Sequence, residues 1–155
     1  MAYLDVITLA TAKNYLGIDD TLTEDDNDIT RMIKGALRYI ENFTNVMIYA
    51  RDKDYIVNNY ECRVYDYPIN TVNTSDLTAT KKPKYTLYTT NDSSVDAVSI
   101  NVGYATASDV PSDLIDVALE IIELNYYGEK ERGAAKKELS DLSKEVLYQY
   151  KRFYI

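Results

Sequence analysis

The hydrophobic pattern is densest between residues 110 and 132, where it predicts a helix over residues 113–127 with Ser112 as its N-cap. Apolar side chains cover nearly the whole circumference of this segment, which is typical of a helix buried on most sides. The exception is a line of carboxylates at helical spacing, which is either a solvated face or a surface that repels whatever it faces. The line consists of Asp113, Asp116, Glu120 and Glu123.

Two helical patterns precede this segment. Residues 8–17 form a short one, with Thr8 as a candidate N-cap and Gly17 as a candidate left-handed C-cap. A longer amphipathic pattern spans residues 24–43 and follows an acidic connection, in which Thr23 and Asp26 resemble a capping box. Its outer face carries a basic stripe that suits either solvent or the carboxylates of a neighbouring subunit: Arg31, Lys34 and Arg38.

From Met47 onward the hydrophobic period changes to two, which predicts strands rich in Tyr, Val and Ile. The Thr- and Asn-rich residues 70–83 are expected to form a long loop, and the NDSS segment before Val95 favours a hairpin turn between the last two strands. The strands are expected within residues 54–60, 61–69, 84–90 and 94–105.

A last helical pattern runs from about Ala134 to the end of the chain, with a narrow apolar seam that includes Leu139 and Leu142. The order of elements predicts an α+β fold that is mainly α. It consists of a bundle of about four helices, a small antiparallel sheet inserted between the second and third, and a projecting C-terminal helix. Residues 1–132 form the predicted core, and residues 133–155 form a helical arm of the same domain.

Composition narrows the possible functions. The chain has 155 residues, 46% of them apolar, which suits one folded domain. Its net charge of −8 argues against a basic nucleic-acid-binding patch. The chain contains no histidine, and its single cysteine, Cys62, is expected to be a small half-buried strand residue. We therefore expect no catalytic residues, no cofactor and no metal.

The sequence shows neither a membrane-spanning segment nor a signal peptide. No segment approaches the roughly 20 apolar residues that a membrane-spanning helix needs, and MAYLDVITL lacks the basic start and apolar run of a signal peptide. We therefore expect a protein without a membrane partner that is made, or assembled, in a cytosol.

Several blocks together resemble the tailed-bacteriophage head–tail connector family, also described as portal adaptors. ITLATAKNYLGID is similar to the opening helix of that family, and ITRMIKGALRYIENFTNVMI to its second helix. RVYDYPINTV resembles its Pro-Ile element, and INVGYATASDVPSDLIDVALEIIELNYYGEKER resembles a strand ending in Gly-Tyr, a proline and a long apolar helix. The sequence departs from the family pattern at Asn45, where glycine is usual, and in the helix after Gly133.

The resemblance implies a structural protein of the virion neck and no enzyme. Such connectors form a ring, usually dodecameric, beneath the portal, where they extend the DNA channel and offer a docking surface to neck and tail proteins. The acidic line would then face the channel, and DNA would pass without specific binding. The basic stripe would contact a neighbouring subunit. The C-terminal end would contact the portal or an adjacent subunit through Tyr148, Tyr150, Arg152, Phe153, Tyr154 and Ile155.

Two other classes of protein are compatible with parts of the sequence. An acidic DNA mimic or inhibitor would account for the net charge, but it would be expected to present paired carboxylates over one broad face. A small hydrolase that works through two carboxylates is also conceivable, but no recognisable catalytic motif supports it.

Overall fold

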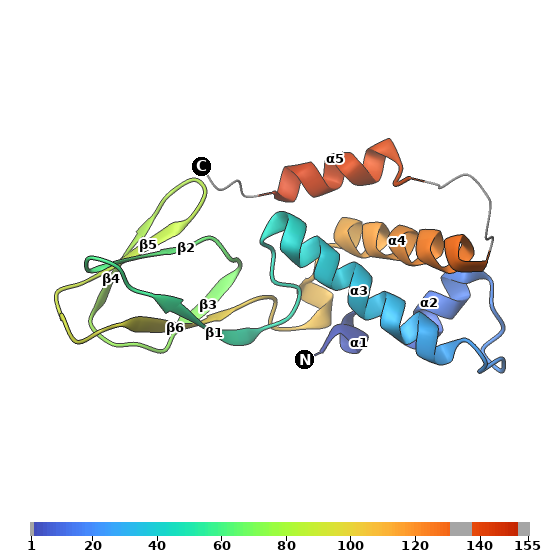
Figure 1. Ribbon diagram of the computed structural model, residues 1–155, viewed down its shortest axis with the longest axis horizontal. Helices are drawn as coiled ribbons and strands as arrows, with labels where there is room; N and C mark the ends of the chain where they lie inside the picture. Colours follow the sequence, from blue (N-terminus) through green and yellow to red (C-terminus); the bar gives the residue numbers. More distant parts are fainter. Residues whose placement is uncertain (1, 131–137, 152–155) are drawn as a thin grey trace.

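The computed structural model describes residues 2–130 and 138–151 and consists of a helical body and a β lobe (Figure 1). The β lobe is inserted between α3 (Asp26–Thr44) and α4 (Ser112–Lys130). The predicted α+β class and the place of the strands are thus confirmed. The helices of the body are α1 (Tyr3–Val6), α2 (Leu9–Leu16), α3 (Asp26–Thr44), α4 (Ser112–Lys130) and α5 (Asp141–Tyr150).

Both predicted caps of α2 are confirmed, but the predicted cap at the start of α3 is not. The Thr8 side chain accepts a hydrogen bond from the Thr11 backbone N–H at 3.1 Å, and Gly17 ends α2 in the left-handed conformation with a φ of 69°. Asn45 ends α3 with a φ of 61°, a left-handed conformation that asparagine tolerates better than most residues. The predicted capping box at Thr23 is wrong, because Asp25 is the N-cap of α3.

The start of α4 lies slightly earlier than predicted. Ser112 belongs to the helix itself, and the Pro111 carbonyl accepts the backbone N–H groups of Leu114 and Ile115 at 3.1 and 3.3 Å. The short helix α1 was not predicted at all, because four residues are too few to display a helical period.

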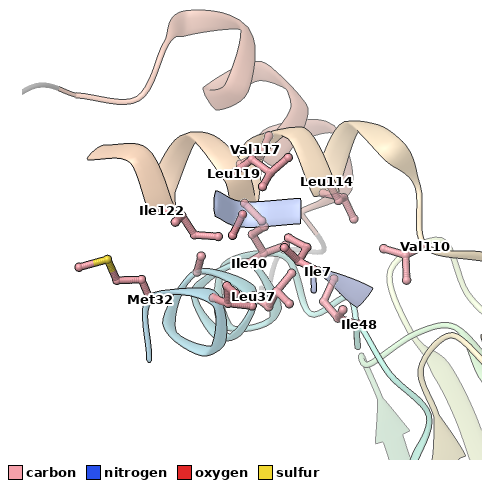
Figure 2. Close-up of a cluster of buried hydrophobic side chains, with 14 of the residues drawn as sticks. Ile7, Met32, Leu37, Ile40, Ile48, Val110, Leu114, Val117, Leu119 and Ile122 are labelled. Atoms are coloured by element: carbon pink, nitrogen blue, oxygen red, sulfur yellow. The ribbon is translucent and has the colours of Figure 1, made fainter. Parts of the chain in front are cut away.

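The main hydrophobic core lies between α3 and α4 and is closed by α1, α2 and α5 (Figure 2). On α3 the buried side chains include Ile33, Leu37 and Ile40, each without exposed surface. On α4 they include Leu114 and Ile122, also fully buried. The wide apolar circumference of residues 113–127 is thus explained by contacts on several sides, with α3, α2 and α5.

The β lobe consists of two three-stranded antiparallel sheets rather than the single small sheet predicted, with strand orders β1-β6-β3 and β2-β5-β4. They enclose a second, smaller core, to which Val64 and Tyr88 contribute from one sheet and Ile100 from the other. A 3-10 turn, η1 (Ala107–Asp109), leads from the lobe to α4. The strands are β1 (Arg51–Ile56), β2 (Glu61–Val64), β3 (Ile69–Val72), β4 (Leu77–Lys81), β5 (Thr86–Thr90) and β6 (Ala97–Val102).

Two strand predictions are wrong. The predicted hairpin around NDSS does not form, because β5 and β6 belong to different sheets and cover the small core from opposite sides. The predicted loop at 70–83 contains most of β3 and all of β4. These two strands are largely exposed, so their Thr-rich sequence favours a strand without showing the alternation of apolar and polar residues.

The C-terminal helix does not project. Helix α5 packs along α4 and the end of α3, where it buries Leu147 to 2% exposure (Figure 1). The predicted seam placed Leu142 inside, but this side chain is 72% exposed. Residues 138–140 are not helical and Ser140 is the N-cap of α5, while the predicted start at Ala134 lies outside the described residues.

Candidate interaction surfaces

Three of the sequence blocks that carry the family resemblance meet at the junction between the helical body and the β lobe. The Met47 backbone N–H donates to the Tyr67 carbonyl at 2.8 Å, and the Tyr67 N–H donates to the Asn45 carbonyl at 3.2 Å. The Gly103 N–H donates to the Pro68 carbonyl at 2.8 Å, and the peptide bond between Tyr67 and Pro68 is cis. The end of α3, the Pro-Ile element and the Gly-Tyr strand end therefore form one backbone-bonded unit.

Glycine at position 103 is required by this close packing. Its φ of 114° is unfavourable for other residues, and a Cβ atom here would lie 2.2 Å from the Tyr49 carbonyl oxygen. The Gly103 carbonyl also accepts a hydrogen bond from the Asn70 side-chain amide at 2.7 Å. The residue thus lets two chain segments approach each other at the point where the two lobes join.

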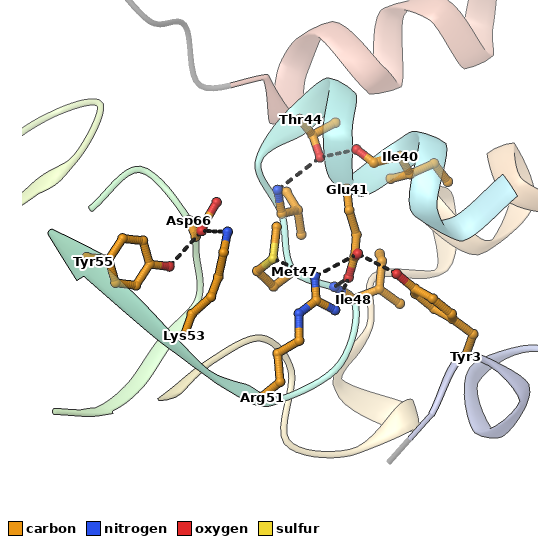
Figure 3. A network of polar contacts seen from close by, with 11 residues as sticks. Tyr3, Ile40, Glu41, Thr44, Met47, Ile48, Arg51, Lys53, Tyr55 and Asp66 are labelled. Carbon is orange, nitrogen blue, oxygen red and sulfur yellow. Dashed lines mark hydrogen bonds and ion pairs between the residues drawn. The ribbon is translucent and has the colours of Figure 1, made fainter. Parts of the chain in front are cut away.

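A buried carboxylate, Glu41, holds α1, α3 and the first strand together at the same junction (Figure 3). Its side chain is 3% exposed and accepts hydrogen bonds from the Tyr3 hydroxyl at 2.6 Å and the Ile48 backbone N–H at 2.8 Å. Arg51 donates to both carboxylate oxygens, at 3.0 and 2.9 Å, and lies over the Tyr49 ring. Burial and the bond to Glu41 raise the pKa of Tyr3, which keeps this hydroxyl a donor.

A second buried carboxylate, Asp66, lies in the β lobe next to the junction (Figure 3). Asp66 is 5% exposed, accepts a hydrogen bond from the Tyr55 hydroxyl at 2.6 Å and forms an ion pair with Lys53. Sequence reasoning identified neither Glu41 nor Asp66. The only available signal for Glu41 was its position next to Ile40 on the apolar stripe of α3.

The acidic line of α4 is partly occupied by α5. Both oxygens of Asp113 lie 3.1 Å from the Tyr150 hydroxyl, which donates to this carboxylate. Glu120 accepts hydrogen bonds from the Ser140 N–H at 2.5 Å and the Ser140 hydroxyl at 2.9 Å, and also from the Ser143 hydroxyl. The Glu120 carboxylate therefore sits at the positive N-terminal end of α5, where a helix favours negative charge.

These hydrogen bonds shift the pKa values of Glu120 and Tyr150 in opposite directions. Burial disfavours the charged form of Glu120, but hydrogen bonds from Ser143 and Ser140 outweigh burial and lower its pKa. Burial, together with the hydrogen bond to Asp113, raises the pKa of Tyr150 to about 12. At neutral pH the Glu120 carboxylate is thus a charged acceptor and the Tyr150 hydroxyl is a neutral donor.

The other two acids of the line lie toward α2. Asp116 is exposed and Glu123 is half-buried, and the ring of Tyr15 lies beside them. Burial raises the pKa of Tyr15, as do the charges of Glu123, Glu120 and Asp116. The outer face of α4 therefore presents negative charge between α2 and α5. Whether these acids face a DNA channel stays a prediction.

The basic stripe of α3 is exposed along its whole length. Arg31 forms an exposed ion pair with Asp28 at 3.5 Å, which contributes little to stability. Lys34 and Arg38 form no ion pair with any described residue. The stripe is thus exposed to solvent, and its contact with a neighbouring subunit stays a prediction.

Aromatic side chains at the end of α3 meet the end of α5. Tyr39 stacks on Phe43 with ring centroids 6.1 Å apart, and Phe43 meets the edge of Tyr148 at 5.5 Å. The Lys151 ammonium lies 4.3 Å from the centre of the Phe43 ring. Tyr148 is 57% exposed, so it remains accessible as predicted contact residue.

The rest of the predicted C-terminal contact set is only partly described. Tyr150 is used internally, because its carbonyl accepts the Tyr67 hydroxyl at 2.9 Å and its own hydroxyl binds Asp113. Residues 152–155, which include Arg152, Phe153, Tyr154 and Ile155, lie outside the described residues.

Other chemistry is sparse in the part of the chain that the structure describes. Cys62 is buried in β2 rather than half-buried, and burial raises the pKa of its thiol, which disfavours a reactive thiolate. Across residues 2–130 and 138–151, acidic and cysteine side chains form no cluster that fits a metal ion. None of the described helices combines the length and apolar character needed to span a bilayer.

Comparison with solved structures gives the same fold over the whole chain. The neck of an empty gene transfer agent (GTA) particle, computed with C6 symmetry, matches with a TM-score of 0.74 and 14% identity, covering 100% of this chain and 94% of that chain. The neck of a native GTA particle, computed with C12 symmetry, matches with a TM-score of 0.71 and 11% identity, at 100% and 94% coverage. A chain of the virion of a native GTA particle matches with a TM-score of 0.70 and 14% identity, covering 97% of this chain and 91% of that chain.

The sequence itself matches one family. No curated protein matches it significantly. The profile described as phage gp6-like head-tail connector protein matches residues 6–151, which include both lobes and α5. The resemblance drawn from the sequence blocks is thus confirmed, together with its expectation of a structural protein of the virion neck. The chain belongs to the phage gp6-like head–tail connector family.

Proposed function

We propose that this protein is one subunit of a ring that lies beneath the portal, extends the DNA channel and provides a docking surface for neck and tail proteins. The observation that carries the proposal is the family match over residues 6–151. The common fold with chains of GTA necks computed with C6 and C12 symmetry supports a ring. In this function the chain binds and positions other proteins and transforms no molecule.

The charge of the chain supports a channel that DNA does not adhere to. A net charge of −8 per subunit, repeated around a ring, repels the phosphate backbone at short range. The acids of α4 are the first candidates for this wall. Because Asp113 and Glu120 bind α5, the acids of the line that best suit an external contact are Asp116 and Glu123.

The portal contact is proposed to lie at the C-terminal end, beyond the aromatic cluster of Phe43 and Tyr148. The supporting observation is that α5 ends next to α3 and leaves Tyr148 exposed, with residues 152–155 following directly. Deletion of all of α5 is a poor test, because Leu147 belongs to the core. Removal of residues 152–155 alone leaves the described part of α5 in place.

The test is native mass or sedimentation of the full chain, alone and with its cognate portal. The proposed function predicts a ring of this chain bound to portal, and loss of portal binding without loss of folding when residues 152–155 are removed. Virions that lack this protein are expected to lose their tails. A chain that stays a monomer in the presence of portal, or tailed and infectious virions without it, would overturn the proposal.

A further inference from the structure

Helices α3 and α4 form an antiparallel pair whose geometry bears on how copies of this chain contact each other. Both helices join the β lobe, α3 through its C-terminal end and α4 through its N-terminal end (Figure 1). At the far end of the pair, the Tyr126 hydroxyl of α4 donates to Asp25 at the start of α3, at 2.7 Å. The two apolar stripes face each other across the main core (Figure 2).

Because a helix has 3.6 residues per turn, the charged stripe of each helix lies opposite its buried stripe. On α3 the exposed residues Arg31, Lys34 and Arg38 alternate with the buried Ile33 and Ile40. On α4 the acidic line lies opposite the buried Leu114 and Ile122; Asp116 is exposed, Glu123 is half-buried and Glu120 is bound by α5. The body therefore presents a positive face on one side of the helix pair and a negative face on the other.

The charges on the two faces also match in spacing. The basic residues follow one another at three and four positions along α3, and the acids from Asp116 through Glu120 to Glu123 follow at four and three along α4. Each set spans about 10 Å at 1.5 Å per residue. When the two helices run in opposite directions, all three positions coincide, and Arg38 lies opposite Asp116.

We propose that the α3 face of one copy docks in antiparallel register on the α4 face of the next copy, an inference that rests on the proposed ring. Arg38 pairs with Asp116 and Arg31 with Glu123 of that second copy, while Lys34 faces Glu120, whose carboxylate already binds α5. The contact is heterologous, because it joins two different surfaces of the chain, and repeated contacts of this kind close into a ring.

The direction of the helices agrees with a ring of many copies. Rotation about the ring axis changes the direction of any helix by no more than the angle between neighbouring subunits, which is about 30° for twelve copies. Since α3 and α4 are antiparallel within one copy, α3 of one copy and α4 of the next are also close to antiparallel. A large ring therefore permits the antiparallel direction in which the charges coincide.

The proposal assigns Asp116 and Glu123 to a subunit contact rather than to the channel wall. A partner with positive charge relieves the repulsion within the acidic line, which no Lys or Arg of the same segment does. Two half-exposed rings, Tyr15 beside the acids and Tyr39 beside Arg38, add contact area of the kind that interfaces favour.

The test is charge reversal with a compensating swap in the full chain. Arg38→Glu and Asp116→Arg each replace an attraction by a repulsion at every contact, and each is expected to raise the concentration needed for ring assembly by about tenfold. The double variant restores the pair with opposite polarity and is expected to recover assembly. The matched controls are Lys82→Glu and Asp54→Arg, which change the charge equally on exposed residues of the β lobe.

Ring assembly is measured by native mass spectrometry or sedimentation, alone and on the cognate portal, with thermal unfolding to verify that each variant folds. Weaker ring assembly in both single variants, together with recovered assembly in the double variant, supports the contact. Rings that assemble normally in both single variants overturn it and leave the connector function intact. Normal rings that release or retain DNA abnormally after Asp116→Arg assign the acid to the channel instead. A wild-type chain that forms no ring even with portal overturns both proposals.

Discussion

The helical body and the β lobe differ in how much core each possesses. The body closes a large apolar cluster to which all of its helices contribute, with side chains such as Ile40 and Leu114 fully buried. The lobe has two small sheets around a much smaller cluster, and it leaves Ile56 74% exposed at the end of an edge strand. The comparison indicates that the body can hold its shape by packing alone, whereas the lobe depends on the polar junction that connects it to the body.

Truncation of one buried isoleucine to alanine in each core is expected to give the largest loss of stability. Ile40 in the body and Ile100 in the lobe are both fully buried. Ile40→Ala is expected to lower the free energy of unfolding by about 4 kcal/mol, and Ile100→Ala by about 2 kcal/mol, because a small core collapses more easily around a cavity. Chemical denaturation followed by circular dichroism measures both values. Equal losses would contradict the difference between the lobes.

The junction provides the next test. In Gly103→Ala the new Cβ atom meets the Tyr49 carbonyl oxygen and the backbone holds an unfavourable φ, so we expect a loss of about 3 kcal/mol. In hydrogen exchange, the amides of the β lobe should exchange faster than in the wild-type chain, whereas those of α3 and α4 should remain protected. Gly35→Ala lies on the exposed side of α3, where the new Cβ atom would meet no side chain and no other segment within 4 Å. It is the matched control and should not destabilise the chain.

Removing the charge of Glu41 separates packing from polar connection. Glu41→Gln keeps the shape of the side chain but leaves Arg51 without its ion pair, and we expect a loss of about 2 kcal/mol. Tyr3→Phe removes only one of the donors to Glu41 and leaves the ion pair with Arg51 intact. It should therefore cost less, about 1 kcal/mol. A larger loss for Tyr3→Phe than for Glu41→Gln, measured by denaturation, would contradict the central position of the carboxylate.

The attachment of α5 is expected to give the smallest effect and to depend on pH. Because the folded-state pKa of Glu120 is lowered, its contribution is present above about pH 4.5 and is lost as the pH falls through its folded value. The pKa of Tyr150 is raised to about 12, so its contribution is complete below pH 10 and is lost as the pH rises toward 12. Protection of α5 in hydrogen exchange should decrease at both extremes.

Tyr150→Phe should abolish the alkaline loss and leave the acid loss, and Glu120→Gln should do the reverse. Each substitution is expected to lower the free energy of unfolding by roughly 1 kcal/mol at neutral pH. Protection of α5 that does not change with pH in the wild-type chain would show that Leu147 and the aromatic cluster suffice to hold the helix.

Local signals along the chain were enough to predict α2, α3 and most of α4, the caps at Thr8 and Gly17, and the place of the strands between the helices. Each of these features depends on residues within one or two turns of each other, so it is visible in the order of residues. The family also was predicted from ordered blocks of sequence, although no block specifies a contact.

The partners of the strands, the position of α5 and the buried charges depended on residues far apart in the chain. β5 pairs with strands of one sheet and β6 with strands of the other, a choice made by the shared small core rather than by the turn between them. Helix α5 docks through Leu147 and Glu120, because α4 offers both an apolar flank and an acceptor for its N-terminus. Periodicity shows that a helix has two faces, but packing alone selects the neighbour that each face meets.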